Sequence, residues 1–274
     1  MTLQATDFTF VTQMVRQRSS IDLQPGKEYL VESRLAPIAR SLGEKDVAAL
    51  VLRLRKGDAQ LTEAVVDALT TNETSWFRDS HPFDAFTQHL LPDVARSSSS
   101  RQINIWSAAC SSGQEAFSLS MLLLDWLPAH PGYSAKIYGT DISPKMVDRA
   151  RAARFSQLEV NRGLRAPYLV KYFDQNGRDW VLRPQVRDMC RFERGNLAQP
   201  AVNVPTCDIV FLRNVLIYFD LETKRTVLTH VRRVLRPGGF LVLGGAESTL
   251  NLDDAFQRME LGRAVVFRHT GGAA

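Results

Sequence analysis

The sequence predicts an α/β fold with a doubly wound parallel sheet, and three observations support it. Residues 103–106 are apolar or β-branched, as in a buried parallel strand, and residues 108–113 form a small-residue turn that leads into a helix. The next apolar strand, residues 137–141, ends on Asp141. An acid at this place accepts the two hydroxyls of a ribose, whereas the turn lacks the Gly-x-Gly-x-x-Gly pattern that cradles a pyrophosphate. The turn therefore favours a ribose-bearing ligand without a pyrophosphate, such as S-adenosylmethionine.

The chain has the composition of an ordinary globular protein. Its 274 residues, 45% of them apolar and 23% charged, allow one large domain or two modest ones. Three cysteines without a Cys-x-x-Cys pair and five scattered histidines indicate neither a disulfide framework nor a zinc site, so we expect no metal. No apolar run approaches about 20 residues, and the amino terminus lacks a basic stretch followed by an apolar one. We therefore expect a cytoplasmic protein that is not inserted in a membrane.

Positive charge is concentrated in one segment. The whole chain carries a formal charge of +5, whereas residues 149–194 alone hold eleven Lys and Arg against five Asp and Glu. Residues 1–70 hold nine basic and nine acidic residues and are balanced. A local basic face predicts an acidic partner that docks on one side of the molecule.

Apolar residues at helical spacing run through the first 70 residues, and no strand pattern interrupts them. Pro37 is expected to kink the second of these helices or to restart it as a first-turn proline. A further helix, residues 81–94, and a Ser-rich patch, residues 97–100, precede the first strand. We therefore expect a helical domain over residues 1–75 and an α/β domain over residues 76–274. The expected amino-terminal helices present Phe8, Val11, Met14 and Val15 on one face and then cover residues 29–42, 47–54 and 61–69.

The second half of the chain continues the alternation of strand and helix. Ser143 and Pro144 have the pattern of an N-cap and a first-turn proline, and residues 236–239 have the pattern of a helix stop before a strand. This order predicts a doubly wound sheet whose ligand lies over the carboxyl ends of the strands. The expected elements are helices over residues 144–151 and 221–235 and strands over residues 207–213, 240–243 and 263–269.

One segment, residues 168–194, does not fit this alternation. Short strand-like pieces at residues 172–173, 180–182 and 189–192 are joined by turns at Asn176-Gly177 and Arg183-Pro184. They predict a small antiparallel β-subdomain that is inserted into the α/β domain and lies in the basic segment.

Four sequence segments together carry a resemblance to a known family. They are residues 71–79, 109–115, 139–143 and 213–219. With them, almost the entire chain resembles the CheR family, the chemotaxis receptor glutamate methyltransferases of bacteria. The resemblance implies a Rossmann-like class I SAM-dependent methyltransferase sheet with a small all-helical amino-terminal domain and an antiparallel β insertion. It also implies transfer of methyl groups from S-adenosylmethionine to glutamate side chains of chemoreceptors, with S-adenosylhomocysteine as the product.

The cofactor residues of that family match positions of this chain one by one. The resemblance implies that Asp141 binds the ribose hydroxyls, Glu115 faces the methionyl ammonium and Asn196 hydrogen-bonds the adenine edge. Considered alone, an Asp after a strand is as often a helix N-cap, and Asn196 fits a turn equally well. The implied cofactor-binding residues are Asn72, Thr74, Arg78, Glu115, Asp141, Asn196, Leu197, Asn214 and Val215.

The implied reaction depends on positioning rather than on acid–base catalysis. A glutamate carboxylate has an unperturbed pKa of about 4.3, so at neutral pH it attacks the sulfonium methyl without a general base. The sequence accordingly lacks a Ser/His/Asp or Cys/His nucleophile arrangement, and Cys110 is interpreted as a packed thiol of the turn. The resemblance places Arg78 and Tyr218 beside the transferred methyl, where they would hold the acceptor carboxylate. Considered alone, Arg78 fits a surface arginine and Tyr218 a core aromatic.

The implied partners are the acidic methylation helices in the cytoplasmic signalling domain of chemoreceptors, which would recruit the enzyme to membrane-bound receptor arrays. In part of the family, the β-subdomain also captures a peptide at the receptor's carboxyl terminus by strand addition. Here the span over residues 172–196 is compact, and its first turn is shorter than in peptide-tethered relatives. We therefore do not expect this tether.

Two other functions remain as alternatives. An RNA or small-molecule methyltransferase would share the scaffold, but residues 214–217 occupy the place of the Asn/Asp-Pro-Pro-aromatic motif that serves amino-group acceptors. The basic segment also lacks the interleaved stacking aromatics of a single-stranded RNA site, so we expect no nucleic-acid partner. A non-catalytic scaffold protein would have lost cofactor positions, whereas the implied positions are all present.

Overall fold

The computed structural model describes residues 3–97, 100–201 and 203–271 of the chain. These described residues form two compact units. The smaller unit contains the amino-terminal helices up to Thr71 together with Tyr218–Thr223, and the larger unit contains Asn72–Ile217 and the chain from Lys224 onward. Ser98 and Ser99, which belong to the predicted Ser-rich patch, lie outside the described residues.

The division falls before the boundary that the sequence suggested at residue 75. Contacts of Asn72 and Glu73 to the larger unit explain this. The Asn72 carbonyl accepts a hydrogen bond from Ser111 Oγ at 2.8 Å, and Glu73 forms an ion pair with Arg162 at 3.1 Å. Asn72 and Glu73, which follow the last helix of the smaller unit in the chain, are therefore tied to the larger unit.

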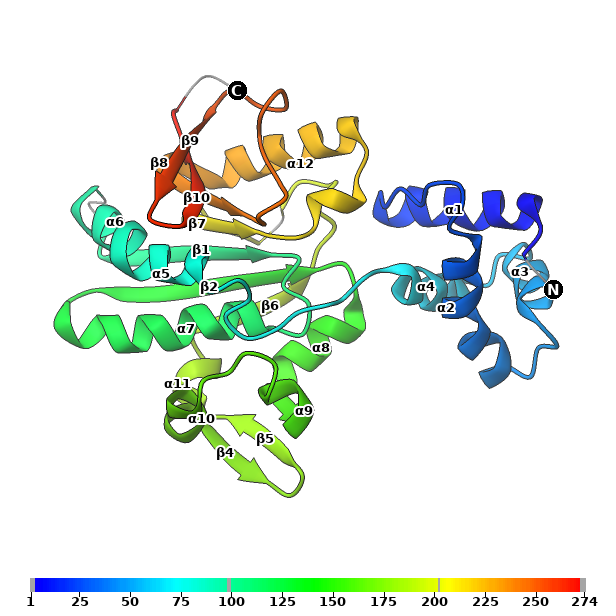
Figure 1. Cartoon of the computed structure of the whole chain (residues 1–274), viewed down its shortest axis with the longest axis horizontal. Coiled ribbons are helices and arrows are strands. Elements are labelled where there is room, and N and C mark those ends of the chain that lie inside the picture. The colour runs from blue at the N-terminus through cyan, green and yellow to red at the C-terminus, as the bar shows by residue number, and fades with distance from the viewer. Residues whose placement is uncertain (1–2, 98–99, 202, 272–274) are drawn as a thin grey trace. The chain divides into compact units, whose positions relative to one another are not determined.

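The described residues up to Thr71 contain the four helices labelled α1 to α4 in Figure 1. Each of these helices buries one apolar face. Asp46 and Asp58 act as N-caps, because their carboxylates accept the N–H groups of Ala49 at 2.9 Å and Leu61 at 3.0 Å. The predicted helices are confirmed, and the second continues through Pro37 instead of restarting there. The helices are α1 (Ala5–Ser19), α2 (Glu28–Ser41), α3 (Val47–Leu54) and α4 (Ala59–Leu69).

The described part of the larger unit contains a seven-stranded sheet in the order β6-β2-β1-β7-β8-β10-β9 (Figure 1). Pairing is parallel from β6 to β8, and β10 pairs antiparallel with both β8 and β9. The predicted doubly wound sheet is thereby confirmed, and its strand order reverses between β1 and β7, where ligands of such sheets bind. The strands are β1 (Gln102–Ala108), β2 (Ser134–Asp141), β6 (Cys190–Arg194), β7 (Cys207–Leu212), β8 (Leu235–Leu243), β9 (Phe256–Leu261) and β10 (Ala264–His269).

Helices connect these strands and pack on the sheet. α7 packs against β2, and α8 packs against both β2 and β6. Ser143 caps α8 as predicted, because its Oγ accepts the N–H of Met146 at 3.2 Å. No helix in the described ranges combines the length and the apolar composition that crossing a bilayer requires. The helices are α5 (His81–Ala85), α6 (Leu91–Ser97), α7 (Gln114–Trp126), α8 (Pro144–Ala152), α9 (Gln157–Val160), α10 (Ala166–Tyr172), α11 (Pro184–Arg187) and α12 (Leu221–Val234), with a π-helical turn (Phe86–Leu90) between α5 and α6 and short 3-10 turns at Leu127–Ala129 and Leu216–Tyr218.

The small antiparallel sheet differs from the predicted one in its third strand. It has the order β3-β5-β4, made of β3 (Arg154–Ser156), β4 (Phe173–Asn176) and β5 (Asp179–Leu182). The hairpin turn at Gly177 is confirmed, since Asn176 pairs with Asp179 across it. The piece at residues 189–192 was assigned to this subdomain wrongly, because β6 pairs in parallel with β2 in the large sheet.

A close approach between two residues accounts for the position of β6. Phe192 of β6 packs directly over Gly139 of β2, where an added Cβ would lie 2.4 Å from the Phe192 ring. Such contacts depend on the three-dimensional neighbour and leave no pattern in a strand of five residues. The sequence also did not indicate β9, whose edge position lets Gln257, Arg258 and Glu260 face solvent.

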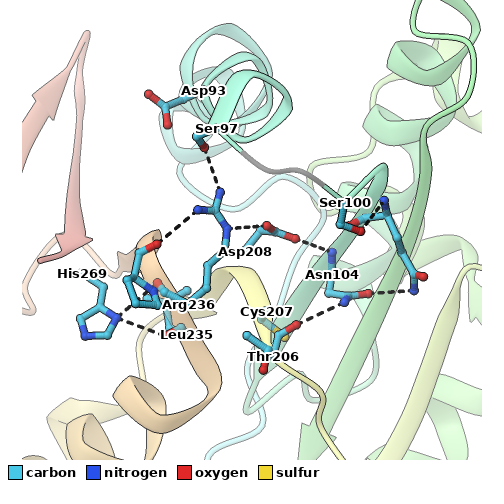
Figure 2. Close-up of polar contacts among 12 residues, drawn as sticks. Asp93, Ser97, Ser100, Asn104, Thr206, Cys207, Asp208, Leu235, Arg236 and His269 are labelled. Atoms are coloured by element: carbon cyan, nitrogen blue, oxygen red, sulfur yellow. Dashed lines mark hydrogen bonds and ion pairs between the residues drawn. The ribbon is translucent and has the colours of Figure 1, made fainter. Parts of the chain in front are cut away.

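The amino ends of the central strands are joined by a polar network around Arg236 (Figure 2). Arg236 Nε donates to Asp208 at 2.6 Å, and its Nη2 donates to Ser97 Oγ at 3.0 Å. The second oxygen of Asp208 accepts the N–H of Asn104 at 2.9 Å, and Asn104 in turn donates to the Thr206 carbonyl at 3.2 Å. The network thus ties β1, β7 and β8 together at the end opposite to their carboxyl termini.

A second carboxylate, Asp125 at the end of α7, supports α10. It accepts hydrogen bonds from Tyr172 Oη at 2.6 Å and Lys171 Nζ at 2.5 Å. Burial raises the pKa of Asp125, but the hydrogen bonds from Lys171 and Tyr172 outweigh it, so the pKa lies below the usual value. Burial, together with the bond to Asp125, raises the pKa of Tyr172 to about 12.

Replacing Asp125 by Asn is expected to lower the free energy of unfolding by about 1 kcal/mol at pH 7, because the charge-assisted bond to Tyr172 is lost. Since the folded-state pKa of Asp125 is lowered, its stabilisation is present above the unfolded pKa of about 3.9 and is lost as the pH falls through the folded value. Urea unfolding at a series of pH values from 7 down to about 2 should show the variant and the wild type converging at the acid end. Asp148→Asn, at a side chain that is 75% exposed, is the control. A difference that is independent of pH would contradict the assignment.

Candidate functional site

The turn between β1 and α7 lies where the strand order of the sheet reverses. Ala109, Ser111 and Gly113 all have positive φ, at 58°, 49° and 94°. The Cys110 N–H donates to the Thr140 carbonyl at 3.0 Å, which holds the turn against the end of β2. At Gly113 an added Cβ would lie 2.8 Å from the Phe117 ring, so the predicted small-residue turn requires glycine here.

Asp141 is buried at the carboxyl end of β2, as predicted. Its Oδ2 accepts the N–H of Ser111 at 2.8 Å, and its Oδ1 accepts the N–H of Ser143 at 2.9 Å. The carboxylate therefore joins the turn after β1 to the start of α8. Asp141 is not the N-cap of α8, because Ser143 has that role. Its interaction with a ribose stays a prediction.

Glu115, in the first turn of α7, is held by two partners. Its Oε1 accepts from Ser107 Oγ at 2.7 Å, and its Oε2 forms an ion pair with Arg213 Nη1 at 3.1 Å. The Arg213 side chain is 2% exposed and forms a second ion pair with Asp79 at 2.7 Å. Arg213 was not predicted as a site residue, although a charged residue directly after the apolar run Ile209–Leu212 of β7 was a visible signal.

Arg78 lies in a backbone segment of unusual conformation. Phe77, Asp79 and Ser80 have φ values of 47°, 66° and 50°, which cost on the order of 1–3 kcal/mol each for residues with a side chain. The Phe77 N–H donates to Ser118 Oγ at 3.1 Å, and the Arg78 carbonyl accepts from Arg213 Nη2 at 2.8 Å. Residues in such strained conformations cluster at functional sites.

The side chain of Arg78 has no carboxylate partner among the described residues. Its Nη1 donates to the Glu73 carbonyl at 3.1 Å, and the residue is partly exposed. The Asn72 carbonyl accepts a hydrogen bond from Ser111 Oγ, which brings Asn72 close to the turn after β1. Thr74, which lies between Asn72 and Arg78 in the sequence, is half-buried. Three of the predicted residues thus lie on the segment that enters the larger unit.

Trp76 anchors this segment. Its indole is buried edge-on against Phe155 and Phe173, at centroid distances of 4.9 and 5.4 Å, and its Nε1 donates to the Glu159 carbonyl at 3.1 Å. Its own N–H donates to the Arg162 carbonyl at 3.0 Å. The small β-subdomain therefore supports the segment that carries Arg78.

Asn196 and Leu197 follow the end of β6. The Gly195 N–H donates to the Asp141 carbonyl at 2.9 Å, which brings this loop to the site. Asn196 Oδ1 accepts the N–H of Ala198 at 3.0 Å, so part of its side chain serves the turn. Leu197 is buried, and its carbonyl accepts from His230 Nδ1 at 3.1 Å.

The loop after β7 is organised by Glu247, which sequence reasoning missed. One Glu247 oxygen accepts the N–H groups of Val215 and Leu216 at 2.9 and 2.7 Å, and the other accepts those of Asn214 and Gly244, both at 2.7 Å. Asn214 has a φ of 57°, and Gly244 has no room for a Cβ. The predicted Asn214-Val215 pair is therefore fixed through its backbone by an acid that comes from the loop after β8.

Cys110 and Tyr218 lie in different units of the structure. Burial raises the pKa of the Cys110 thiol well above its usual value, and the nearby Asp141 and Glu115 carboxylates raise it further, which supports the interpretation as a packed thiol. Tyr218 belongs to the smaller unit, where its carbonyl accepts the N–H of Asp22 at 2.9 Å. Within the described residues, no three His, Cys, Asp or Glu side chains form a group that could hold a metal ion.

The larger unit thus brings most of the predicted site to the carboxyl ends of its parallel strands. The residues that meet there are Asn72 and Arg78 from the entering segment, Glu115 and Asp141 from β1–α7 and β2, Asn196 and Leu197 after β6, and Asn214 and Val215 after β7. A sheet of this strand order, with carboxylates at the end of β2 and in the first turn of α7, is the arrangement of a class I SAM-dependent methyltransferase.

Comparison with known families agrees with this class. Residues 72–265 match the family model described as the CheR methyltransferase SAM binding domain, and residues 6–70 match the CheR methyltransferase all-alpha domain. The chain belongs to the CheR family. Its cofactor is S-adenosylmethionine, and the protein is a SAM-dependent methyltransferase of chemotaxis.

Curated relatives cover the chain almost completely. Chemotaxis protein methyltransferase 1 of Pseudomonas aeruginosa PAO1 is 38% identical over 96% of this chain and 97% of its own length. Chemotaxis protein methyltransferase Cher2 of Pseudomonas putida KT2440 is 35% identical over 96% and 97%. The chemotaxis protein methyltransferase of Escherichia coli K12 is 32% identical over 91% and 86%.

Replacing Glu247 by Gln is expected to destabilise the protein by about 2–4 kcal/mol, because an amide offers one acceptor oxygen and turns an NH₂ group toward backbone N–H donors. The affinity for S-adenosylmethionine should fall at least about fivefold, since the loop of Asn214 and Val215 loses its support. Chemical denaturation and titration calorimetry measure the two effects. Glu260→Gln, at a side chain that is 69% exposed, should change neither. A destabilised variant that binds the cofactor normally would remove Asn214 and Val215 from the cofactor site.

Proposed function

We propose that this protein transfers methyl groups from S-adenosylmethionine to glutamate side chains of chemoreceptors and so forms carboxyl methyl esters. The observation that carries the proposal is the Arg78 side chain, a partly exposed guanidinium without a carboxylate partner among the described residues. Its backbone is held in place while its charge is not neutralised, which suits a carboxylate that arrives with another molecule. Membership of the CheR family supports the same acceptor.

The chemistry of a carboxylate acceptor matches what the site offers. An ionised glutamate needs no general base, so the enzyme has only to align the carboxylate with the sulfonium methyl and to exclude water. Positioning of this kind supplies up to about 7–11 kcal/mol in favourable cases. Arg78 binds the attacking group by charge-assisted hydrogen bonds, and Tyr218 adds a neutral one. For Tyr218 this role rests on the match of residues 213–219 to the family's motif.

The basic segment supports an acidic receptor as the partner. At least eight of its eleven Lys and Arg side chains form ion pairs with acids, among them Arg154 with Asp179 and Arg183 with Asp174. Exposed ion pairs of this kind contribute little, about 0–1 kcal/mol each, so they exchange partners readily. An acidic helix can therefore bind this face by replacing them, and the binding should weaken as the salt concentration rises.

Transfer of radiolabelled methyl from S-adenosylmethionine to membranes that contain chemoreceptors tests the acceptor. We expect label on the receptor that mild alkali releases as volatile methanol, because a carboxyl methyl ester is hydrolysed under conditions that leave methylated nitrogen intact. Label that resists alkali would refute the carboxylate acceptor. A receptor with Gln in place of the methylated glutamates is the matched control and should take up no label.

The change Arg78→Ala should reduce methyl transfer to below about a tenth of the wild-type turnover, because the acceptor carboxylate loses its charged partner. The fold should persist, since the contacts that hold the segment are made by the Arg78 backbone. Turnover under saturating cofactor and the near-ultraviolet circular dichroism spectrum measure both. Arg258→Ala, on the exposed strand β9, should remain fully active. If Arg78→Ala kept more than this fraction of activity, Arg78 would not be a positioning group for the acceptor.

A further inference from the structure

The buried guanidinium of Arg213 connects two parts of the site that the chain itself keeps far apart. Its Nη1 contacts the Glu115 carboxylate at 3.1 Å, while its Nη2 contacts Asp79 at 2.7 Å and the Arg78 carbonyl at 2.8 Å. The side chain is 2% exposed, and its charge lies over the Phe83 ring at 5.6 Å. One rigid group therefore bridges the first turn of α7 and the strained segment that carries Arg78.

The geometry of Arg213 suits a shared positioning role. A guanidinium presents its donors in a fixed plane, so the positions of Glu115 and of the Arg78 backbone are set relative to each other. A lysine at this place would keep the charge, but its single ammonium would reach either Glu115 or the Arg78 backbone and not both. The Arg213 Nε is buried without a hydrogen-bond partner, which indicates that the side chain is oriented for the groups at its two Nη atoms rather than for complete satisfaction of its donors.

The local charges also point toward a cationic ligand. Arg213 forms ion pairs with two carboxylates, Glu115 and Asp79, so these three side chains together carry a net negative charge. Glu115 is 14% exposed and accepts from Ser107 on its other oxygen. Each of its oxygens still has a lone pair to offer, and its orientation is fixed before a cation arrives.

For the carboxyl methylation proposed above, on which this role rests, we infer that Arg213 is a positioning residue that aligns cofactor and acceptor. Through Glu115 it orients the carboxylate that receives the ammonium of S-adenosylmethionine. Through Asp79 and the Arg78 carbonyl it sets the place of the guanidinium that receives the acceptor. The alignment of sulfonium methyl and attacking oxygen then depends on one buried side chain.

The first variant is Arg213→Lys, and Arg236→Lys is its matched control. Arg236 is also an arginine that bridges a carboxylate and a second segment, with a side chain that is 19% exposed, but it does so at the opposite ends of the strands (Figure 2). Both variants should melt cooperatively and at similarly lowered temperatures. Arg213→Lys should bind S-adenosylmethionine about tenfold more weakly and turn over about 100-fold more slowly, whereas Arg236→Lys should stay within about twofold of wild type in both.

The second variant, Asp79→Asn, weakens the contact of Arg213 to the Arg78 segment and leaves its contact to Glu115 in place. It does not disturb the buried core, because Asp79 is 41% exposed. Affinity for S-adenosylmethionine, measured by calorimetry without acceptor, should stay within about twofold, while kcat should fall about tenfold as the Arg78 segment loosens. This split between cofactor binding and turnover distinguishes positioning from a general loss of stability. It also remains informative if Arg213→Lys does not fold.

The inference is overturned if Asp79→Asn keeps the wild-type kcat, or if a folded Arg213→Lys behaves like Arg236→Lys in cofactor affinity and turnover. Failure of the proposed function has a different signature, because the wild-type enzyme would then release no methanol from labelled receptor. In that case, calorimetry of Arg213→Lys still decides whether Arg213 orients Glu115, since cofactor binding requires no acceptor.

Discussion

β1 lies between β2 and β7 in the sheet, and its parallel pairing with both brings several chain segments to one edge. The loops that leave these strands turn in opposite directions at this place, which leaves room for a ligand over the strand ends. Asp141, at the end of β2, accepts a hydrogen bond from the turn after β1. Glu115, at the start of α7, forms an ion pair with Arg213, which directly follows β7. The candidate site therefore follows from the order of strands, and the remaining features refine it.

Carboxylates hold the backbone of this edge in conformations that the chain would otherwise avoid. Glu247 accepts four backbone N–H groups and fixes the loop of Asn214, while Asp141 accepts two and fixes the turn around Ser111. Both loops contain a residue other than glycine in the left-handed region, at a cost of about 1–3 kcal/mol. Charge-assisted hydrogen bonds of about 1.5–3 kcal/mol each offset that cost. A site built in this way is arranged before its ligand arrives, which is the property that a positioning enzyme needs.

The charges of the larger unit fall into two kinds with different roles. Arg213 is buried and Arg236 is partly buried. Each is paired with a carboxylate, at opposite ends of the strands, and breaking such pairs is costly because a charge is left without compensation. The arginines of the basic segment are exposed and weakly paired, so they are free to exchange partners. Arg78 is intermediate: its backbone is fixed, and its charge has no acidic partner among the described residues. This combination is what a site for an incoming carboxylate requires.

The sequence by itself determined the helical amino-terminal region, the strand and helix order, the turn after β1 and the acid at Asp141, because these depend on local patterns of polarity, capping and small residues. Family resemblance added the CheR assignment, and the family models agree with it. Only the tertiary structure placed β6 beside β2, where Gly139 receives the Phe192 ring, and only it revealed Arg213 and Glu247 as partners of the site. Their partners lie far away in the chain, so no local pattern marks them. Their roles come from contacts that exist after the sheet has formed.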